Sequence, residues 1–107
     1  MMADQKFKSL KEFYPHYLSE HRHTTSRVLH FIGTGLVILA FLTGFLFHDW
    51  RFFLAMPVLG YGFAWAGHFF FEKNKPATFK YPLYSLASDF ILFYDLLNGK
   101  QSFSVKQ

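Results

Sequence analysis

The feature that most constrains this chain is a pair of uncharged apolar runs, Val28–Phe47 and Phe52–Phe71, separated by only four residues. Each run has twenty residues, enough for a helix that crosses a bilayer core of about 30 Å. Inside lipid every backbone polar group must be paired, so such segments are expected to be helical. A buried hairpin of a soluble protein is the competing interpretation, but a chain of 107 residues has too little other protein to cover both runs. The sequence therefore predicts a membrane-embedded helical hairpin.

Composition narrows the class of protein further. Aromatic residues make up 22% of the chain and charged residues only 17%, below the roughly 25% charged residues of an average soluble domain. There is no cysteine, which excludes disulfides, thiolate metal sites and cysteine nucleophiles. The net charge of +4 is not arranged as a basic stripe on a soluble fold, so no nucleic-acid partner is expected. We expect a single membrane domain over residues 1–107.

The segments that flank the hairpin predict shorter helices, so the expected fold class is all-α. Residues 1–27 carry apolar and basic residues at helical spacing, which indicates one or two amphipathic helices at a membrane surface or packed on the domain. Pro15 is expected to kink or restart a helix there, and the polar start argues against a secretory signal peptide. A third short helix is predicted over residues 83–97, ended by Asn98 and Gly99, which either re-enters the membrane or packs along the hairpin.

The distribution of lysine and arginine predicts an orientation. Five of these residues precede the first run, five follow the second, and Arg51 alone lies between them. The positive-inside rule then places both termini in the cytoplasm, in a bacterial inner membrane or in the endoplasmic reticulum. Two spans bury little surface, so a homo-oligomer is as compatible with the sequence as a monomer.

This topology gathers four polar residues at one membrane face. His21 and His30 flank the start of the first run, and His68 and Glu72 flank the end of the second. Because the runs are antiparallel, all four are expected at the cytoplasmic face, where ionisable residues usually have a partner or a task. His21 and His30 converge only if the chain bends between them, which the helix-capping residues 24–26 permit.

The histidines predict a metal site or, alternatively, a set of boundary residues that only form hydrogen bonds. His68 and Glu72 are spaced i, i+4, so on an α-helix they could share a metal, or Glu72 could hold the His68 ring. Six histidines without cysteine suit iron or zinc with imidazole and oxygen ligands. A rival trio is His16, His23 and His30, which would align on one continuous helix because they are seven residues apart.

Two motifs resemble a known family. "HRHTTSRVLH" at residues 21–30 and "GHFFFEKNKPA" at residues 67–77 are similar to the motifs of the Mpo-like family, small membrane proteins formerly called a domain of unknown function. The fungal member of that family is a 2-hydroxy fatty acid dioxygenase of the endoplasmic reticulum. The resemblance covers roughly residues 12–97. Because the fungal member has additional sequence between the two motifs, the resemblance indicates the chemistry better than it indicates the substrate.

The resemblance implies an Fe(II)-dependent oxygenase that cleaves 2-hydroxy fatty acids with O₂ to the acid one carbon shorter, in fatty-acid α-oxidation. The implied metal ligands are His21, His30 and His68, with Fe(II) as the cofactor and zinc as the alternative, and the implied catalytic carboxylate is Glu72. The candidates that balance the charge of a bound lipid carboxylate are Arg27, Lys73 and Lys75, and further candidate site residues are Asp89 and His23. A zinc-dependent lipid hydrolase, a non-catalytic membrane protein and a lipid-binding or assembly module are the alternative functions.

Overall fold

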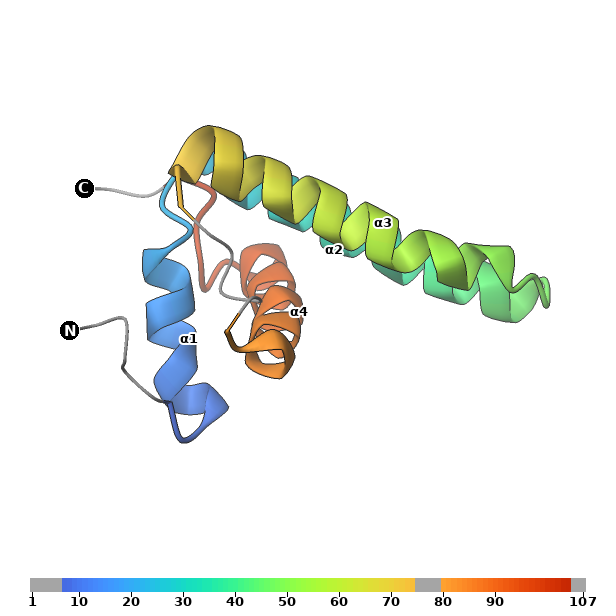
Figure 1. Ribbon diagram of the computed structural model, residues 1–107, viewed down its shortest axis with the longest axis horizontal. Coiled ribbons are helices and arrows are strands. Elements are labelled where there is room, and N and C mark those ends of the chain that lie inside the picture. The colour runs from blue at the N-terminus through green and yellow to red at the C-terminus, as the bar shows by residue number, and fades with distance from the viewer. Residues whose placement is uncertain (1–6, 75–79, 105–107) are drawn as a thin grey trace.

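The computed structural model describes residues 7–74 and 80–104, and within these ranges the chain contains helices and no strand, as the all-α prediction requires. Figure 1 shows a long two-helix hairpin with two shorter helices gathered at one end of it. In chain order the elements are α1 (Leu10–Ser19), α2 (Thr24–Leu46), α3 (Arg51–Ala66), the π-helix η2 (Gly67–Glu72) and α4 (Pro82–Asn98).

The hairpin consists of α2 packed against α3 and η2, which continue one another. Its helices cover Thr24–Leu46 and Arg51–Glu72, so the predicted spans are confirmed as helices, although α2 begins four residues before the apolar run does. At roughly 1.5 Å per residue, either helix is long enough to cross a membrane, and its composition permits it. The turn between them is closed by Asp49, whose carboxylate accepts from the Arg51 backbone N–H at 3.1 Å and pairs with the Arg51 guanidinium at 2.8 Å.

The surface of the hairpin is apolar and exposed. Phe45, Leu46 and Phe47 are 67–74% exposed, and Val58 on the partner helix is 73% exposed. The most apolar stretch of α2 is only 28% buried, and that of α3–η2 only 11%. The core helix of a soluble protein would be mostly buried. In Figure 1 the turn end of the hairpin extends well beyond α1 and α4. Exposed apolar surface of this extent is typical of contact with lipid.

Two glycines allow the helices of the hairpin to approach closely. A Cβ at Gly33 would lie 2.7 Å from Cβ of Phe63, and one at Gly67 would lie 2.8 Å from Oγ of the fully buried Ser26. Small residues at such crossings permit close packing of membrane helices. The contact between Gly67 and Ser26 fixes the end of the second helix against the start of the first.

Helices α1 and α4 pack on each other around Phe13, Tyr17, Leu92 and Leu96. The N-terminal amphipathic segment is therefore packed on the domain, the second of the two predicted options. The expectation that a helix restarts at Pro15 is wrong, because α1 continues through it from Leu10 to Ser19, and the expectation of a kink stays a prediction. Pro15 lies on the exposed side of α1, where water can satisfy the carbonyl that loses its helical partner.

The chain bends between α1 and α2, as the convergence of the first two candidate ligands requires. Residues 20–23 are not helical, so His16, His23 and His30 do not share one helix and the rival trio is wrong. The residue that caps α2 is His23, with Thr24 and Thr25 inside the first turn.

Helix α4 stops at Asn98, and Gly99 follows in the left-handed conformation with φ +86°, which confirms the predicted helix stop.

Candidate metal centre

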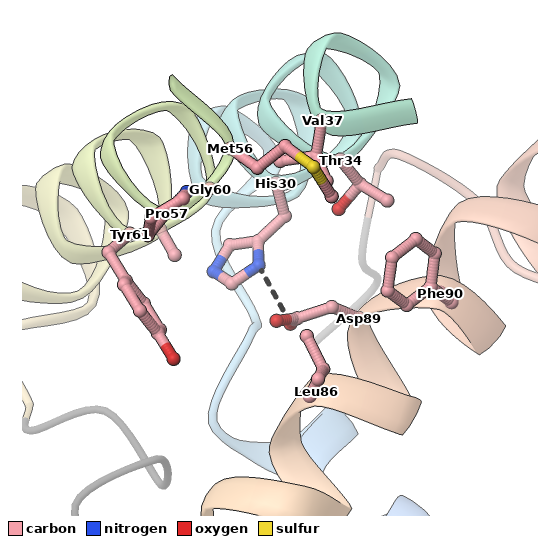
Figure 2. Close-up of a pocket in the computed structure, with 11 residues that line it drawn as sticks. His30, Thr34, Val37, Met56, Pro57, Gly60, Tyr61, Leu86, Asp89 and Phe90 are labelled. Carbon is pink, nitrogen blue, oxygen red and sulfur yellow. Dashed lines mark ion pairs between the residues drawn. The ribbon is translucent and has the colours of Figure 1, made fainter. Parts of the chain in front are cut away.

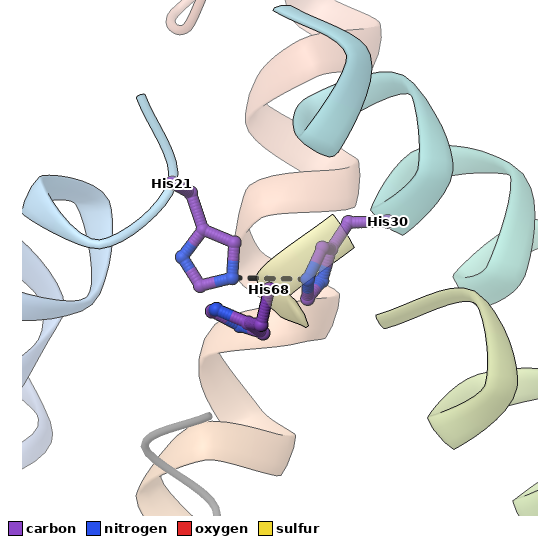
Figure 3. A group of neighbouring side chains, drawn as sticks. All are labelled: His21, His30 and His68. Carbon is purple, nitrogen blue, oxygen red and sulfur yellow. Dashed lines mark hydrogen bonds between the residues drawn. The ribbon is translucent and has the colours of Figure 1, made fainter. Parts of the chain in front are cut away.

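Three histidines from three different segments meet where the open end of the hairpin contacts α1 and α4 (Figure 3). His21 lies in the bend between α1 and α2, His30 on the second turn of α2, and His68 on η2. All three side chains are buried, and their ring nitrogens lie within 4.8 Å of one another. The two closest nitrogens, Nε2 of His21 and Nε2 of His30, are 3.0 Å apart. The predicted set of His21, His30 and His68 is therefore brought together in the fold.

Each imidazole ring has an acceptor at its other nitrogen. His21 Nδ1 donates to the backbone carbonyl of Tyr17 at 2.7 Å, and His68 Nδ1 donates to Oδ1 of Asn74 at 2.7 Å. His30 Nδ1 lies 3.4 Å from the Asp89 carboxylate. Carbonyl oxygens only accept, so Nδ1 of His21 and Nδ1 of His68 carry the proton, and each of these two rings keeps its lone pair on Nε2.

The arrangement of lone pairs fits a bound cation. Nε2 of His21 and Nε2 of His30 form a hydrogen bond at 3.0 Å (Figure 3), which places one proton between them, and a metal ion could take the place of that proton. Metal–imidazole bonds are about 2.0–2.1 Å long, so two nitrogens at this separation can share one ion. Burial, followed by the neighbouring His30 and His68, lowers the pKa of His21 well below 6.5, which keeps the ring neutral and able to bind a metal.

The position of His21 is set by Arg27, although the sequence predicted a substrate-binding role for this arginine. Its Nε donates to the carbonyl of His21 at 2.8 Å, and its Nη1 donates to Oε1 of Gln101 at 3.1 Å and to the carbonyl of Ser102 at 2.7 Å. Because Arg27 is only 5% exposed, its guanidinium anchors the bend and the C-terminal segment to α2.

The π-helix changes the relation of His68 to Glu72. The hydrogen bonds of a π-helix run from i to i+5 in place of the i to i+4 bonds of an α-helix, and Glu72 is not among the groups whose ligand atoms meet at the cluster. The carboxylate of Glu72 instead accepts from the backbone N–H of His23 at 2.7 Å. This contact places a negative charge at the start of α2, where the helix dipole favours it. Glu72 thus links the end of the second hairpin helix to the start of the first, outside the group of three histidines.

Asn74 is a site residue that the sequence did not predict. It follows the left-handed residue Lys73 (φ +61°), and its backbone N–H bonds to the carbonyl of His68 at 3.0 Å. Its Nδ2 donates to the carbonyl of Glu20 at 3.3 Å, which leaves Oδ1 to accept from His68. The signal was present, since Asn74 belongs to the second motif, but helical spacing does not bring a residue six positions later to His68, and the left-handed turn at Lys73 does.

Tyr17 and Asp89 together support His30 from α1 and α4. The Tyr17 hydroxyl donates to Oδ1 of Asp89 and lies 3.4 Å from Nδ1 of His30. Burial and the Asp89 carboxylate raise the pKa of Tyr17 well above its ordinary value, so the hydroxyl remains a donor. Asp89 was a predicted additional site residue and lies beside the cluster. Tyr17 was predicted only as an apolar position, although a phenol buried one helical turn before His21 usually has a polar partner.

The remaining predicted residues lie away from the cluster. The side chains of His23 and Lys73 are exposed, and His23 contributes its backbone N–H to Glu72. Lys75 lies outside the described residues. Their substrate-binding or ligand roles stay predictions.

An apolar cavity of about 270 Å³ adjoins His30 between the hairpin and α4. Figure 2 shows His30 and Asp89 at its polar part, with the Phe90 ring and Leu86 contributed by α4. The lining residues are His30, Thr34 and Val37 from α2; Met56, Pro57, Gly60, Tyr61 and Ala64 from α3; and Leu86, Asp89 and Phe90 from α4. Of the three histidines, His30 is the one that borders this space.

The fold and the cluster define a class: a small all-helical protein with two helices that could span a membrane and a buried three-histidine group that could hold a metal ion. A family-level comparison is more specific. Residues 7–101 match the family described as 2-hydroxy-palmitic acid dioxygenase Mpo1-like, and the chain belongs to this family. No curated protein and no solved structure matched the chain. The family description points to a dioxygenase-like enzyme of lipid metabolism.

Proposed function

We propose that this protein is an Fe(II)-dependent membrane dioxygenase that cleaves 2-hydroxy fatty acids to the acid one carbon shorter. The observation that carries the proposal is the convergence of three buried imidazoles, each with a polar partner at its Nδ1, beside an apolar cavity. Imidazole ligands with open positions suit Fe(II) and O₂ chemistry. The family description supports the same reaction class.

The overall reaction balances without another reductant. One 2-hydroxy acid and one O₂ give the shortened acid, one CO₂ and one water, with the bond between the carboxyl carbon and C2 broken. A bound ferrous ion would supply the activation of O₂ and the oxidative cleavage. His21, His30 and His68 would hold it, and the acceptors Tyr17, Asp89 and Asn74 keep the rings oriented.

The protein also excludes water from the reacting groups. His21 and His68 are 1% and 2% exposed, and His30 is 5% exposed. A low-dielectric site of this kind strengthens the interactions of charged groups and protects reactive species from side reactions. Glu72 orders the start of α2 beneath this site through its contact with His23.

The hairpin supports a membrane location for the enzyme. Both helices are long and apolar enough to span a bilayer. Among the described residues, Lys11 on α1, Arg27 at the start of α2 and Lys73 after η2 lie at the same end of the hairpin as the histidine cluster. We propose that this end faces the cytoplasm, in keeping with the positive-inside rule. A fatty acid would then reach the site from the bilayer.

The test is turnover by detergent-purified protein loaded with Fe(II) and supplied with O₂ and 2-hydroxypalmitate. We expect pentadecanoic acid and CO₂ in equal amounts. His68→Ala should abolish both products, whereas His48→Ala, at the exposed turn far from the cluster, should retain them. Absence of products across several chain lengths, or activity that needs zinc and hydrolyses a lipid ester, would contradict the proposal.

A further inference from the structure

The cavity beside His30 runs lengthwise along the hairpin. Its α2 lining extends from His30 through Thr34 to Val37, a distance of about 10 Å at 1.5 Å rise per residue. The antiparallel α3 places Gly60 opposite Val37, because a Cβ at Gly60 would lie 3.2 Å from Cγ2 of Val37. The cavity therefore has a near end at His30 and a far end beside Val37 and Met56, with Met56 about one helical turn beyond Gly60 on α3.

The two ends differ in chemistry. Polar groups are concentrated at the near end, where His30 and Asp89 lie beside the three-histidine cluster, and the far end is apolar. A ligand that fits this polarity has one polar head and one unbranched apolar tail. Burial of each further methylene of such a tail adds to binding, so the far end can discriminate between tails of different length.

The outer wall of the cavity is continuous with exposed apolar surface. Leu86 and Phe90 of α4 and Tyr61 of α3 line the cavity and are 49%, 39% and 44% exposed. On α4 they continue a stripe of exposed apolar residues formed by Leu83, Leu86, Phe90, Tyr94 and Leu97. A molecule dissolved in a bilayer could therefore enter from the side, between α3 and α4, without passing through water.

From this geometry we propose that the cavity binds the alkyl tail of the fatty acid, and that Gly60 sets the length of tail that fits. This proposal rests on the proposed function, because the proposed function identifies the polar head as that of a 2-hydroxy fatty acid. Gly60 lines the cavity, and even a Cβ there would lie only 3.2 Å from Cγ2 of Val37, so a longer side chain at this position has to extend into the cavity. A larger residue there would shorten the space and leave the metal cluster, about two helical turns away along α2 and α3, in place.

The test uses a palmitate that carries a photoactivatable diazirine near the end of its tail, with the purified full-length protein in detergent. Irradiation should label the peptides that contain Val37 or Met56, and excess unlabelled 2-hydroxypalmitate should compete. Gly60→Leu should lower competable labelling about tenfold, equivalent to ~1.4 kcal/mol. The matched control is Gly62→Leu, because a Cβ at Gly62 meets nothing within 4 Å, and it should label like the natural protein.

A second pair of variants approaches the cavity from α4, in case Gly60→Leu does not fold, as judged by circular dichroism. Leu86→Trp fills the cavity mouth and should also lower competable labelling, whereas Leu83→Trp, which is 78% exposed and outside the lining, should not. Where the enzyme turns over, Gly60→Leu should raise KM for 2-hydroxypalmitate about tenfold more than for 2-hydroxydecanoate.

Labelling needs no turnover, so the two proposals can fail separately. Competable labelling without any oxidation product would retain the tail site and contradict the oxygenase. Labelling of Gly60→Leu and Leu86→Trp at the level of the natural protein would overturn the tail site. Labelling that spreads over the exposed hairpin and does not decrease with excess 2-hydroxypalmitate would also overturn the tail site.

Discussion

At the scale of single residues, the three histidines depend on the groups that hold their second nitrogens. Asp89 is the informative case, because its carboxylate lies 3.4 Å from His30 Nδ1 and also accepts from Tyr17. A carboxylate in this position fixes the ring and makes the opposite nitrogen a better ligand. We assign Asp89 to positioning His30, since it lies on the side of the ring that faces away from His21.

Asp89→Asn should therefore weaken metal binding. The neutral amide can still accept from His30 but no longer polarises the ring, and loss of such partners typically costs about 10–100-fold in metal affinity. Titration against a competing chelator measures the change. The matched control is Asp95→Asn, which removes the equivalent carboxylate that accepts from Tyr14 at 2.9 Å, away from the cluster. Equal affinity in Asp89→Asn and in the natural protein would contradict the assignment.

The burial of His21 predicts a pH dependence of stability for the metal-free protein. The folded pKa is depressed below 6.5, so the unfolded chain binds more protons once the pH falls below that value. Stability should be constant above about pH 6.5 and decrease below it, by about 1.4 kcal/mol per pH unit for one such group.

Thermal unfolding in detergent at pH 7.5 and pH 5.5 measures this effect. His21→Gln should flatten the decrease between the two pH values, whereas His16→Gln, on the partly exposed side of α1, should leave it unchanged. A natural protein that is equally stable at both pH values would show that His21 does not titrate as its burial requires.

At the scale of elements, the contact between η2 and the start of α2 positions His68. A methyl group on Gly67 would lie 2.8 Å from Oγ of Ser26 and 3.4 Å from its Cα. Ser26 is fully buried and cannot move away. Gly67→Ala should therefore lower stability by about 1–3 kcal/mol, the usual cost of overpacking, and weaken metal binding as well. Gly62→Ala, which has open space, should be harmless by the same unfolding and titration measurements.

The role of Glu72 can also be tested at this scale. If it acts as a cap on the start of α2, Glu72→Ala should cost about 0.5–2 kcal/mol of stability and change metal affinity little. The matched control is Glu12→Ala, which removes a similar contact from Glu12 to the Lys8 backbone N–H at 3.1 Å on α1. A loss of metal affinity as large as that of His68→Ala would make Glu72 a ligand and contradict the capping role.

These elements also show what the sequence could predict. Hydropathy and the stop at Gly99 placed α2, α3 and α4 within a few residues, since long apolar helices and their ends have strong local signals. Antiparallel topology was enough to gather His21, His30 and His68. The orientation of Glu72 and the role of Asn74 were not predictable, because the α-helical spacing assumed after Gly67 does not hold in a π-turn. The continuation of α1 through Pro15 depends on the tertiary packing of Phe13 and Tyr17.

At the scale of the whole molecule, the hairpin should place its two ends on opposite sides of a membrane. The chain has no cysteine, so single cysteines report on sidedness without background. Ser9→Cys and Ser104→Cys should react with an impermeant maleimide from the cytoplasmic side, and His48→Cys only from the other side. Labelling of all three from one side would contradict a transmembrane hairpin.

The central claim is that His21, His30 and His68 together bind one metal ion, and the metal content of the purified protein tests it most directly. After loading with Fe(II) without oxygen and removal of free metal, we expect one ion per chain in the natural protein and in His48→Ala. His68→Ala should retain none while it keeps the helical circular dichroism of the natural protein. Full metal content in a folded His68→Ala, or none in the natural protein, would contradict the claim.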